Sequence, residues 1–443
     1  MNKHIGTIKR WRVQIFAITW LAYAAFYFTR KAFSVAKLGI AEDPTFMLDK
    51  MAMANLDAIY LTAYAVGQFT WGILADRFGP RVVVLGGLLI SAGAALVMGN
   101  FATLPIFATC MLIQGLAQST GWSGLCKNLG SFFPSEQRGR VLGLWSSCYA
   151  FGGLVASPFA GWWAYTLIGT WHAAFISSAA VVGLVAVLFF IFQRNKPEDV
   201  GLPAVEPEPE PELTAEESLA QSKISIWVPF KEILRNRTVL VLGLAYFMLK
   251  PARYAILLWG PVIVFEQMPS VGKVGAAIIP TSFELAGLLG PIMIGLASDK
   301  LFGARRMPAC VLSLLALTVT LALFMGALHT GSVVLVVALL FVMGLTLYGP
   351  DSMISGAAAI DFGTAKAGAT AAGFVNGCGS VGAVLGGLLP GYFDSVTVFI
   401  VFAGCAMFSA LVLIPHWNSR PGGLKTKHPC APDRAMNIKP LRT

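Results

Sequence analysis

The stretch LAYFMLKPARYAILLWGP, residues 244–261, is a long apolar run that contains Lys250 and Arg253. Because these two residues lie three positions apart, a helix places both side chains on one side. An ionised side chain at membrane depth is costly unless it faces a partner or a watery cavity. The stretch therefore predicts a membrane-spanning helix whose cations face the protein interior and serve its function.

A second apolar run near the start of the chain has the same character. The stretch AYAAFYFTRKAFSVAK, residues 22–37, carries Arg30, which lies 223 positions before Arg253. The same interval separates GILADRFGPR at residues 72–81 from GLASDKLFGARR at residues 295–306. These correspondences predict two halves of one architecture, each with an arginine at the same place.

The composition is that of an integral membrane protein. Of the 443 residues, 56% are hydrophobic and 12% are charged, and the mean hydropathy is +0.71. The net charge of +10 is explained by the lysines and arginines that such proteins collect on their cytoplasmic side. A nucleic-acid-binding protein would be expected to carry a basic stripe with interleaved aromatic residues, and this sequence has no such stripe. The cysteines and histidines are dispersed, so we expect neither a metal site nor a cofactor.

Twelve apolar runs are long enough to cross a bilayer at about 1.5 Å per residue. They lie near residues 13–37, 56–75, 82–101, 104–125, 141–165, 172–192, 238–264, 274–297, 308–328, 333–358, 368–393 and 397–415. We therefore expect an all-α membrane protein of twelve transmembrane helices in two six-helix bundles. The predicted domains are residues 1–193, a linker at 194–237, residues 238–417 and a tail at 418–443. The linker contains EPEPEPE, whose alternating prolines forbid a regular helix.

The distribution of positive charge predicts the orientation in the membrane. Lysines and arginines gather in the N-terminus, the linker, the tail and alternate loops, whereas the opposite loops hold only Lys50 and Lys273. Both termini are therefore expected on the cytoplasmic side of a cell (inner) membrane. An even number of spans likewise places both termini on the same side of the membrane. The two halves would then run parallel, as in transporters built from paired repeats.

Several motifs narrow the class of protein. The loop motif G-x-x-x-D-R/K occurs in both halves, at residues 72–77 and 295–300, and is typical of the major facilitator superfamily. Longer stretches resemble the organophosphate:phosphate antiporter family within it: FTRKAF (28–33), QGLAQSTGW (114–122), GLWSSCYAFGG (143–153), RYAILLWGP (253–261), FELAG (283–287) and LYGP (347–350). That family includes glycerol-3-phosphate and hexose-phosphate antiporters and a hexose-phosphate sensor. The resemblance extends over nearly the whole chain apart from the linker and the tail.

Two arginines suit a phosphate ligand. A phosphate monoester carries close to two negative charges, and guanidinium offers its oxygens a planar fork of donors that stays charged. The resemblance implies that Arg30 and Arg253 bind the phosphate, in agreement with their spacing in the two halves. The alternative is that each arginine only pairs with an acid across the bundle, and the acids at depth are Asp57, Glu284 and Asp351.

Aromatic side chains recur at helical spacing around these charges. Tyr23 and Tyr27 share a helix face with Arg30, and the pairs Tyr64/Gln68 and Trp145/Tyr149 are each four positions apart. The resemblance implies that they line the substrate cavity, together with Trp122 and Tyr348. Packing or interfacial placement is the alternative for each of them. The predicted substrate-binding residues are thus Arg30, Arg253, Tyr23, Tyr27, Tyr64, Gln68, Trp122, Trp145, Tyr149, Lys250, Glu284 and Tyr348.

Some positions depart from the repeat or from the family. Glu284 occupies an acidic position of the family, but its counterpart in the first half is Leu61, so it is expected to pair with an arginine or lysine in one conformation or to take up a proton. Several antiporters of the family have a lysine where this chain has Gln68 and a histidine where it has Tyr149. Lys250 and Asp351 add one cation and one anion, which either suit a zwitterionic substrate or neutralise each other.

The predicted function is secondary antiport. The protein would exchange a small phosphorylated organic anion, such as a sugar phosphate or glycerol phosphate, for inorganic phosphate by alternating access. Repulsion between the arginines would hinder the empty carrier from reorienting, and the loop motifs would form ionic latches. Alternatives are a membrane-bound sensor of the same ligand and a transporter of a phosphonate or another organic anion. We expect a monomer and no enzyme, because no nucleophile with a nearby base occurs in the spans.

Overall fold

The computed structural model describes residues 2–205, 235–303, 305–359 and 368–419, and its regular elements are all helical. The stretch EPEPEPE and most of the predicted linker and tail lie outside the described residues. The domain boundaries placed in those segments therefore stay predictions.

The first half of the chain forms six helical rods. They are α1 (Asn2–Ile40), α2 (Lys50–Phe78), α3 (Pro80–Asn100), α4 (Leu104–Gln118) with α5 (Thr120–Phe132), α6 (Ser135–Trp145) with α7 (Ser147–Trp162), and α8 (His172–Phe192). Only Ser119 separates α4 from α5, and only Ser146 separates α6 from α7. Both serines have right-handed helical dihedrals, so each pair continues as a single rod. A π turn, η1 (Trp163–Leu167), and a 3-10 turn, η2 (Pro197–Val200), follow α7 and α8.

The second half repeats this order. Its helices are α11 (Arg237–Gln267), α12 (Gly272–Ile278) with α13 (Thr281–Lys300), α14 (Arg306–His329), α15 (Val333–Ser352) with the π turn η4 (Met353–Ala358), α17 (Gly368–Tyr392) and α18 (Ser395–Leu413). Short 3-10 turns, η3 (Pro269–Val271) and η5 (Ile414–His416), precede α12 and follow α18. Among the described residues, eight helical segments are long and apolar enough to cross a membrane by length and composition. The expected fold class is confirmed, and the helix order is consistent with twelve spans.

Several helices are longer than the apolar runs that predicted them. The run expected at residues 13–37 is part of α1, which begins at Asn2, and the run expected at 56–75 is part of α2, which begins at Lys50. A helix satisfies its own backbone hydrogen bonds in lipid and in water alike. Its ends therefore need not coincide with the ends of the apolar sequence.

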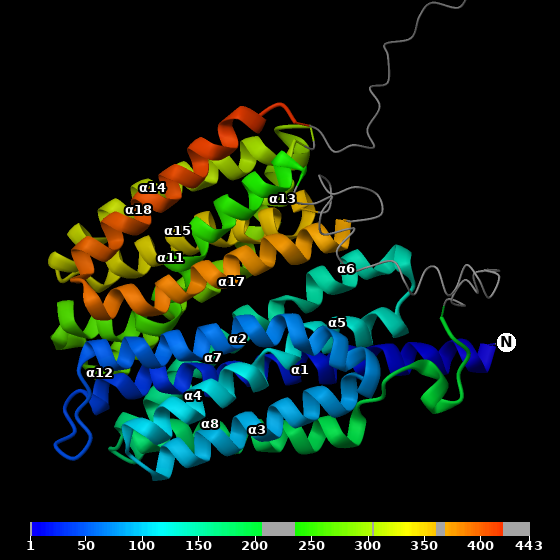
Figure 1. Ribbon diagram of the computed structural model, residues 1–443, viewed down its shortest axis with the longest axis horizontal. Helices are drawn as coiled ribbons and strands as arrows, with labels where there is room; N and C mark the ends of the chain where they lie inside the picture. Colours follow the sequence, from blue (N-terminus) through cyan, green and yellow to red (C-terminus); the bar gives the residue numbers. More distant parts are fainter. Residues whose placement is uncertain (1, 206–234, 304, 360–367, 420–443) are drawn as a thin grey trace, which may run out of the picture.

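The helices form two bundles that pack face to face. Figure 1 shows α1–α8 on one side of the molecule and α11–α18 on the other, with α3 and α8 at one outer edge and α14 and α18 at the other. The bundles meet through α1, α2 and α7 against α11, α13 and α17. Large apolar side chains on the outer helices remain exposed, among them Leu184 and Phe190 of α8 and Val319 and Leu323 of α14. A belt of this kind is suited to lipid.

Glycines allow the closest helix contacts. A Cβ atom at Gly382 of α17 would overlap the carbonyl oxygen of Phe247, and one at Gly386 would overlap that of Pro251, both on α11. Small residues at such crossings let two helix backbones approach within van der Waals distance. This contact fixes α17 against the helix that carries Lys250 and Arg253.

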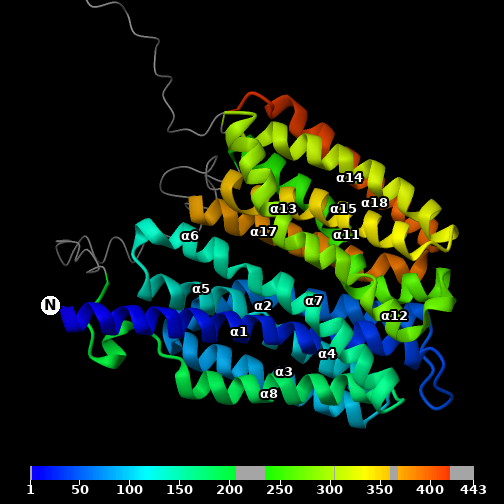
Figure 2. The same cartoon turned by 180° about the vertical axis from the view of Figure 1, so that it is seen from behind.

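The two bundles join firmly at the end of the molecule opposite the N-terminus. There Lys50 forms an ion pair with Glu266 at 2.7 Å, and Lys273 pairs with Glu42 at 2.6 Å. A Cβ atom at Gly391 of α17 would lie 2.6 Å from the carbonyl oxygen of Lys50 on α2. Figures 1 and 2 show α14 and α18 diverging from α3 and α8 toward the end that holds the N-terminus. We refer to these as the joined end and the N-terminal end.

Candidate substrate-binding site

Arg30 lies near the middle of α1 and is 4% exposed. Its Nε donates to Oε1 of Gln118 at 3.0 Å, and its guanidinium lies 4.5 Å from the ring centroid of Tyr27 and 5.0 Å from that of Tyr64. Within the described residues its buried Nη2 has no hydrogen-bond partner. Arg30 is therefore held by an amide and two aromatic faces, with a donor left over for a ligand.

Gln118 orients this arginine. Its Oε1 also accepts a hydrogen bond from the Tyr60 hydroxyl at 2.7 Å, and its Nε2 donates to Oγ1 of Thr29 at 3.2 Å and to Oγ of Ser91 at 3.3 Å. These bonds fix which end of the amide faces Arg30. Sequence reasoning recognised the motif QGLAQSTGW but did not identify Gln118 as a site residue. Its polar side chain in an apolar run was the available signal.

Arg253 has a different environment. Its Nη1 donates to Oδ2 of Asp351 at 2.9 Å, and Nζ of Lys250 lies 3.0 Å from Oδ1 of the same carboxylate. Nζ of Lys250 also donates to the Tyr246 hydroxyl at 2.6 Å. The rings of Tyr348 and Tyr149 lie 4.6 and 5.2 Å from the Arg253 guanidinium. Arg253 thus adopts the acid-paired arrangement, whereas Arg30 does not pair with a carboxylate in the described part of the chain.

Glu284 lies between the bundles. Its Oε1 is 3.3 Å from Nζ of Lys31 on α1, and its Oε2 accepts a hydrogen bond from the Tyr348 hydroxyl. A Cβ atom at Gly153 of α7 would lie 2.8 Å from Cδ of Glu284, so glycine there leaves room for the carboxylate. Glu284 therefore joins α1, α7 and α15 at the interface, although its counterpart Leu61 has no charge.

A continuous set of contacts connects the two arginines. Tyr27, under Arg30, packs against Gly152, and the next residue, Gly153, packs against Glu284. Glu284 in turn accepts the hydrogen bond from Tyr348, which lies under Arg253. In the described part of the chain, the buried charged side chains around this path are Arg30, Lys31, Lys250, Arg253, Glu284 and Asp351. Four are cationic and two are anionic, and a net charge of this sign would attract an anion.

The remaining predicted residues lie in three places. Tyr149 stacks on Tyr348, with ring centroids 6.3 Å apart, and so belongs beside Arg253. Tyr23, Trp122 and Trp145 form an aromatic cluster on the same half as Arg30, and the Tyr23 ring connects it to Tyr27, with ring centroids 6.2 Å apart. Trp145 is completely buried and donates its indole N–H to Thr19, which is a packing arrangement. Gln68 is half-buried on α2.

A second buried ion pair lies nearer the joined end. Lys37 of α1 pairs with Asp57 of α2, and Nζ of Lys37 also lies 3.8 Å from the ring centroid of Trp259 on α11. Both charged side chains are almost completely inaccessible. Sequence reasoning counted Asp57 among the acids at depth but did not pair it. Both lie in apolar runs, but pairing them requires knowing which faces of α1 and α2 meet.

Pro261 frees a backbone carbonyl of α11 that binds side chains of α1. A proline inside a helix leaves the carbonyl four residues earlier without its helical donor, and that carbonyl belongs to Leu257. It accepts hydrogen bonds from Nζ of Lys31 at 2.9 Å and from Oγ of Ser34 at 3.3 Å. The next carbonyl, that of Leu258, accepts from Lys37 at 3.2 Å. Polar side chains of α1 thus bind backbone groups of α11 across the interface.

The loop motifs make contacts within their own halves. Nη1 of Arg306 lies 2.7 Å from Oδ1 of Asp299. In the first half, the backbone N–H of Arg81 donates to Asn195 at 2.8 Å and its guanidinium donates to the Phe190 carbonyl. The side chain of Asp76 lies outside the described residues. The latch role therefore stays a prediction.

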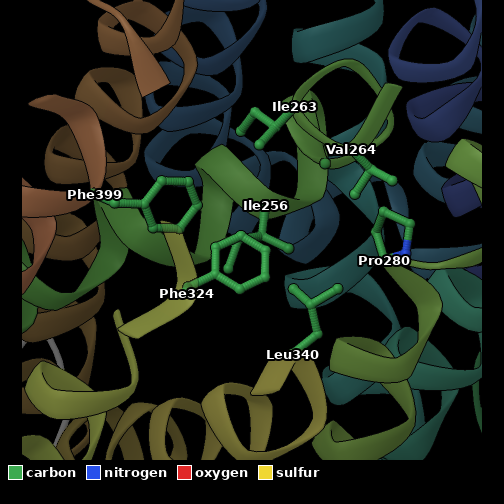
Figure 3. A pocket seen from close by; sticks show the side chains of 8 residues that line it. Ile256, Ile263, Val264, Pro280, Phe324, Leu340 and Phe399 are labelled. Carbon is green, nitrogen blue, oxygen red and sulfur yellow. The ribbon is translucent and has the colours of Figure 1, made fainter. Parts of the chain in front are cut away.

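A small pocket inside the second bundle is entirely apolar. Figure 3 shows Ile256 and Val264 of α11 facing Phe324 of α14, Leu340 of α15 and Phe399 of α18. None of the described residues that line it is charged, so they offer nothing to receive a phosphate. It is a packing gap between helices, separate from the arginine site.

Two face-to-face helical bundles with buried cations at their interface define a membrane transporter. Residues 19–349 match the sequence model of the Major Facilitator Superfamily, and the chain belongs to that superfamily. The fold agrees. The crystal structure of a D-xylose–proton symporter aligns with a TM-score of 0.69 at 15% identity, over 90% of this chain and 97% of the symporter. A bacterial homologue of the lysosomal transporter Spinster, in an inward-facing and unoccupied conformation, gives 0.67 at 14% identity over 92% and 95%.

Curated relatives extend over most of the chain. A "Probable hexose phosphate transport protein" of Chlamydia muridarum is 28% identical over 95% of this chain and 94% of its own length. The glucose-6-phosphate exchanger SLC37A1 of Mus musculus is 26% identical over 93% and 94%. The resemblance to organophosphate transporters that the motifs indicated is thereby confirmed, and the protein is a transporter rather than an enzyme.

Proposed function

We propose that this transporter exchanges a small phosphorylated organic anion, such as a sugar phosphate, for inorganic phosphate. The observation that carries the proposal is the buried charge at the interface. Arg30 and Arg253 come from corresponding helices of the two halves, and together with Lys31 and Lys250 they make four buried cations against two buried acids among the described residues of the site. The names of the relatives agree with a sugar-phosphate substrate.

In this proposal the phosphate binds between the arginines and the organic part lies on the neighbouring rings. Arg30 offers Nη2, and Arg253 offers its buried Nε, which has no hydrogen-bond partner in the described ranges. Tyr27 and Tyr64 flank Arg30, and Tyr149 and Tyr348 flank Arg253. Stacked aromatic rings hold each guanidinium in place. A ligand then meets donors that are already oriented.

Alternating access would follow from rocking of one bundle against the other. The described conformation joins the bundles through Lys50–Glu266 and Lys273–Glu42. The N-terminal end, which the positive-inside rule places in the cytoplasm, would be the accessible side. Release of these pairs and of the α1–α11 hydrogen bonds would open the other side.

Counterflow in proteoliposomes tests the exchange. Vesicles loaded with unlabelled inorganic phosphate are expected to accumulate labelled phosphate transiently, and glucose-6-phosphate or glycerol-3-phosphate outside is expected to compete. Empty vesicles provide the baseline. A membrane sensor with the same pocket would bind these ligands without counterflow, and that result would contradict the proposed exchange.

The Lys37–Asp57 pair gives a prediction about stability. Lys37→Met leaves the Asp57 carboxylate buried without its partner, which typically costs about 3–5 kcal/mol. We expect a lower midpoint of thermal unfolding for Lys37→Met in detergent. The double variant Lys37→Met/Asp57→Leu removes both charges and is expected to recover most of the loss. A double variant as unstable as the single one would show that the pairing is not what stabilises this region.

A further inference from the structure

Asp351 occupies an unusual place for an acid in a site that would bind anions. It is the second-last residue of α15, two positions before the π turn η4 begins, and is 4% exposed. Each carboxylate oxygen contacts a different cation, Oδ1 with Lys250 at 3.0 Å and Oδ2 with Arg253 at 2.9 Å. The carboxylate thus takes the position that a phosphate oxygen would take between a guanidinium and an ammonium group.

Nη1 of Arg253 cannot donate to Asp351 and to a substrate at the same time, so a phosphate that uses Nη1 in addition to the free Nε has to displace the carboxylate. We infer that Asp351 is an internal counter-anion, which occupies Arg253 while the site is empty and releases it when a phosphate binds. The inference rests on the proposed function. It assigns Asp351 a role in setting affinity and in allowing the empty carrier to change conformation.

Lys250 makes this release possible. When Arg253 transfers to the substrate, the carboxylate keeps its contact with Nζ of Lys250, which the Tyr246 hydroxyl also contacts at 2.6 Å. Asp351 is then not left as a buried unpaired charge, which would be strongly unfavourable. Asp351 and Lys250 therefore act together. Asp351 competes with the substrate for Arg253, and Lys250 keeps the Asp351 carboxylate paired after the substrate has bound.

The consequence for transport follows from charge. An empty site with Arg253 and Lys250 both unpaired would be costly to close away from water. Asp351 reduces that cost, so, in contrast to the hindrance expected from two unpaired arginines, the empty carrier closes and reorients, and net movement of substrate accompanies exchange. Without Asp351, a bound anion has to supply the missing negative charge, and transport becomes strictly coupled exchange.

The test uses Asp351→Asn in the full-length protein. We expect inorganic phosphate to bind at least tenfold more tightly, measured by calorimetry or thermal shift. Net efflux of labelled phosphate from vesicles into phosphate-free buffer is expected to fall at least tenfold, while exchange persists. Asp394→Asn is the matched control, because it removes an exposed carboxylate at the start of α18 and asparagine also caps a helix.

A second variant separates the role of Asp351 from general loss of folding. Lys250→Met/Asp351→Asn removes one charge of each sign and leaves Arg253 free, and it is expected to bind phosphate at least threefold more tightly than the native protein. Unchanged or weaker binding in both variants, or undiminished net efflux in Asp351→Asn, overturns the inference. Native protein that neither binds phosphate nor shows counterflow would instead overturn the proposed function.

Discussion

Replacement of Arg30 by alanine is expected to abolish phosphate binding and counterflow. A charge pair about 4 Å apart is worth about 4 kcal/mol at an effective dielectric constant of about 20. Its loss corresponds to a drop in affinity of about a thousandfold. Arg30→Lys keeps the charge but loses the fork of donors and the contact from Nε to Gln118, so we expect a smaller loss of about ten- to a hundredfold.

Counterflow and phosphate binding should both be measured for these variants. Arg194→Ala is a suitable control, because Arg194 is half-buried just after α8 and its guanidinium donates only to the nearby backbone carbonyls of Ile191 and Gln193 among the described residues. Native-like counterflow in Arg30→Ala would contradict a direct role of this arginine. A loss of equal size in Arg194→Ala would indicate that the assay reports folding or insertion instead.

The second large effect is expected at Gly391, where α17 meets α2. A side chain there would overlap Ala54 and lie 2.6 Å from the carbonyl oxygen of Lys50. Gly391→Val should therefore prevent the joined end from closing. We expect counterflow to fall at least tenfold, while the folded protein loses about 1–3 kcal/mol of stability, as is usual for overpacking.

Cysteine labelling detects the opening directly. Leu61→Cys places a thiol at a position on α2 that is 2% exposed and faces Gly387 across the interface. Its maleimide labelling is expected to be at least tenfold faster when Gly391→Val is also present. Gly404→Val serves as the control, since a Cβ atom there meets nothing within 4 Å. Unchanged labelling and transport in Gly391→Val would show that this contact does not gate the joined end.

Much of the architecture could be predicted because hydrophobicity and repetition are local properties of the sequence. The apolar runs located the helices, and the interval between Arg30 and Arg253 related the two halves. The exact ends of α1 and α2 were not predictable, since helices continue beyond the apolar sequence once their hydrogen bonds are satisfied.

The sequence predicted which residues belong to the site better than it predicted which side chains contact one another. Charges within apolar runs identified Arg30, Lys250 and Arg253, but pairing depends on helix rotation and packing, which the sequence does not state. Asp351 was considered as a partner of Lys250, and the structure adds Arg253 to the same carboxylate. Arg30 differs from Arg253 in its partner. The amide of Gln118 accepts the hydrogen bond from Arg30, whereas the carboxylate of Asp351 accepts the one from Arg253.

The central claim concerns one anion held between the two halves. A structure of the protein with arsenate, located by its anomalous scattering, tests that claim most directly. The account predicts one peak at the interface, within about 4 Å of the guanidinium groups of both Arg30 and Arg253, with Asp351 contacting only Lys250. A peak at another place, with Arg253 still bound to Asp351, would contradict it.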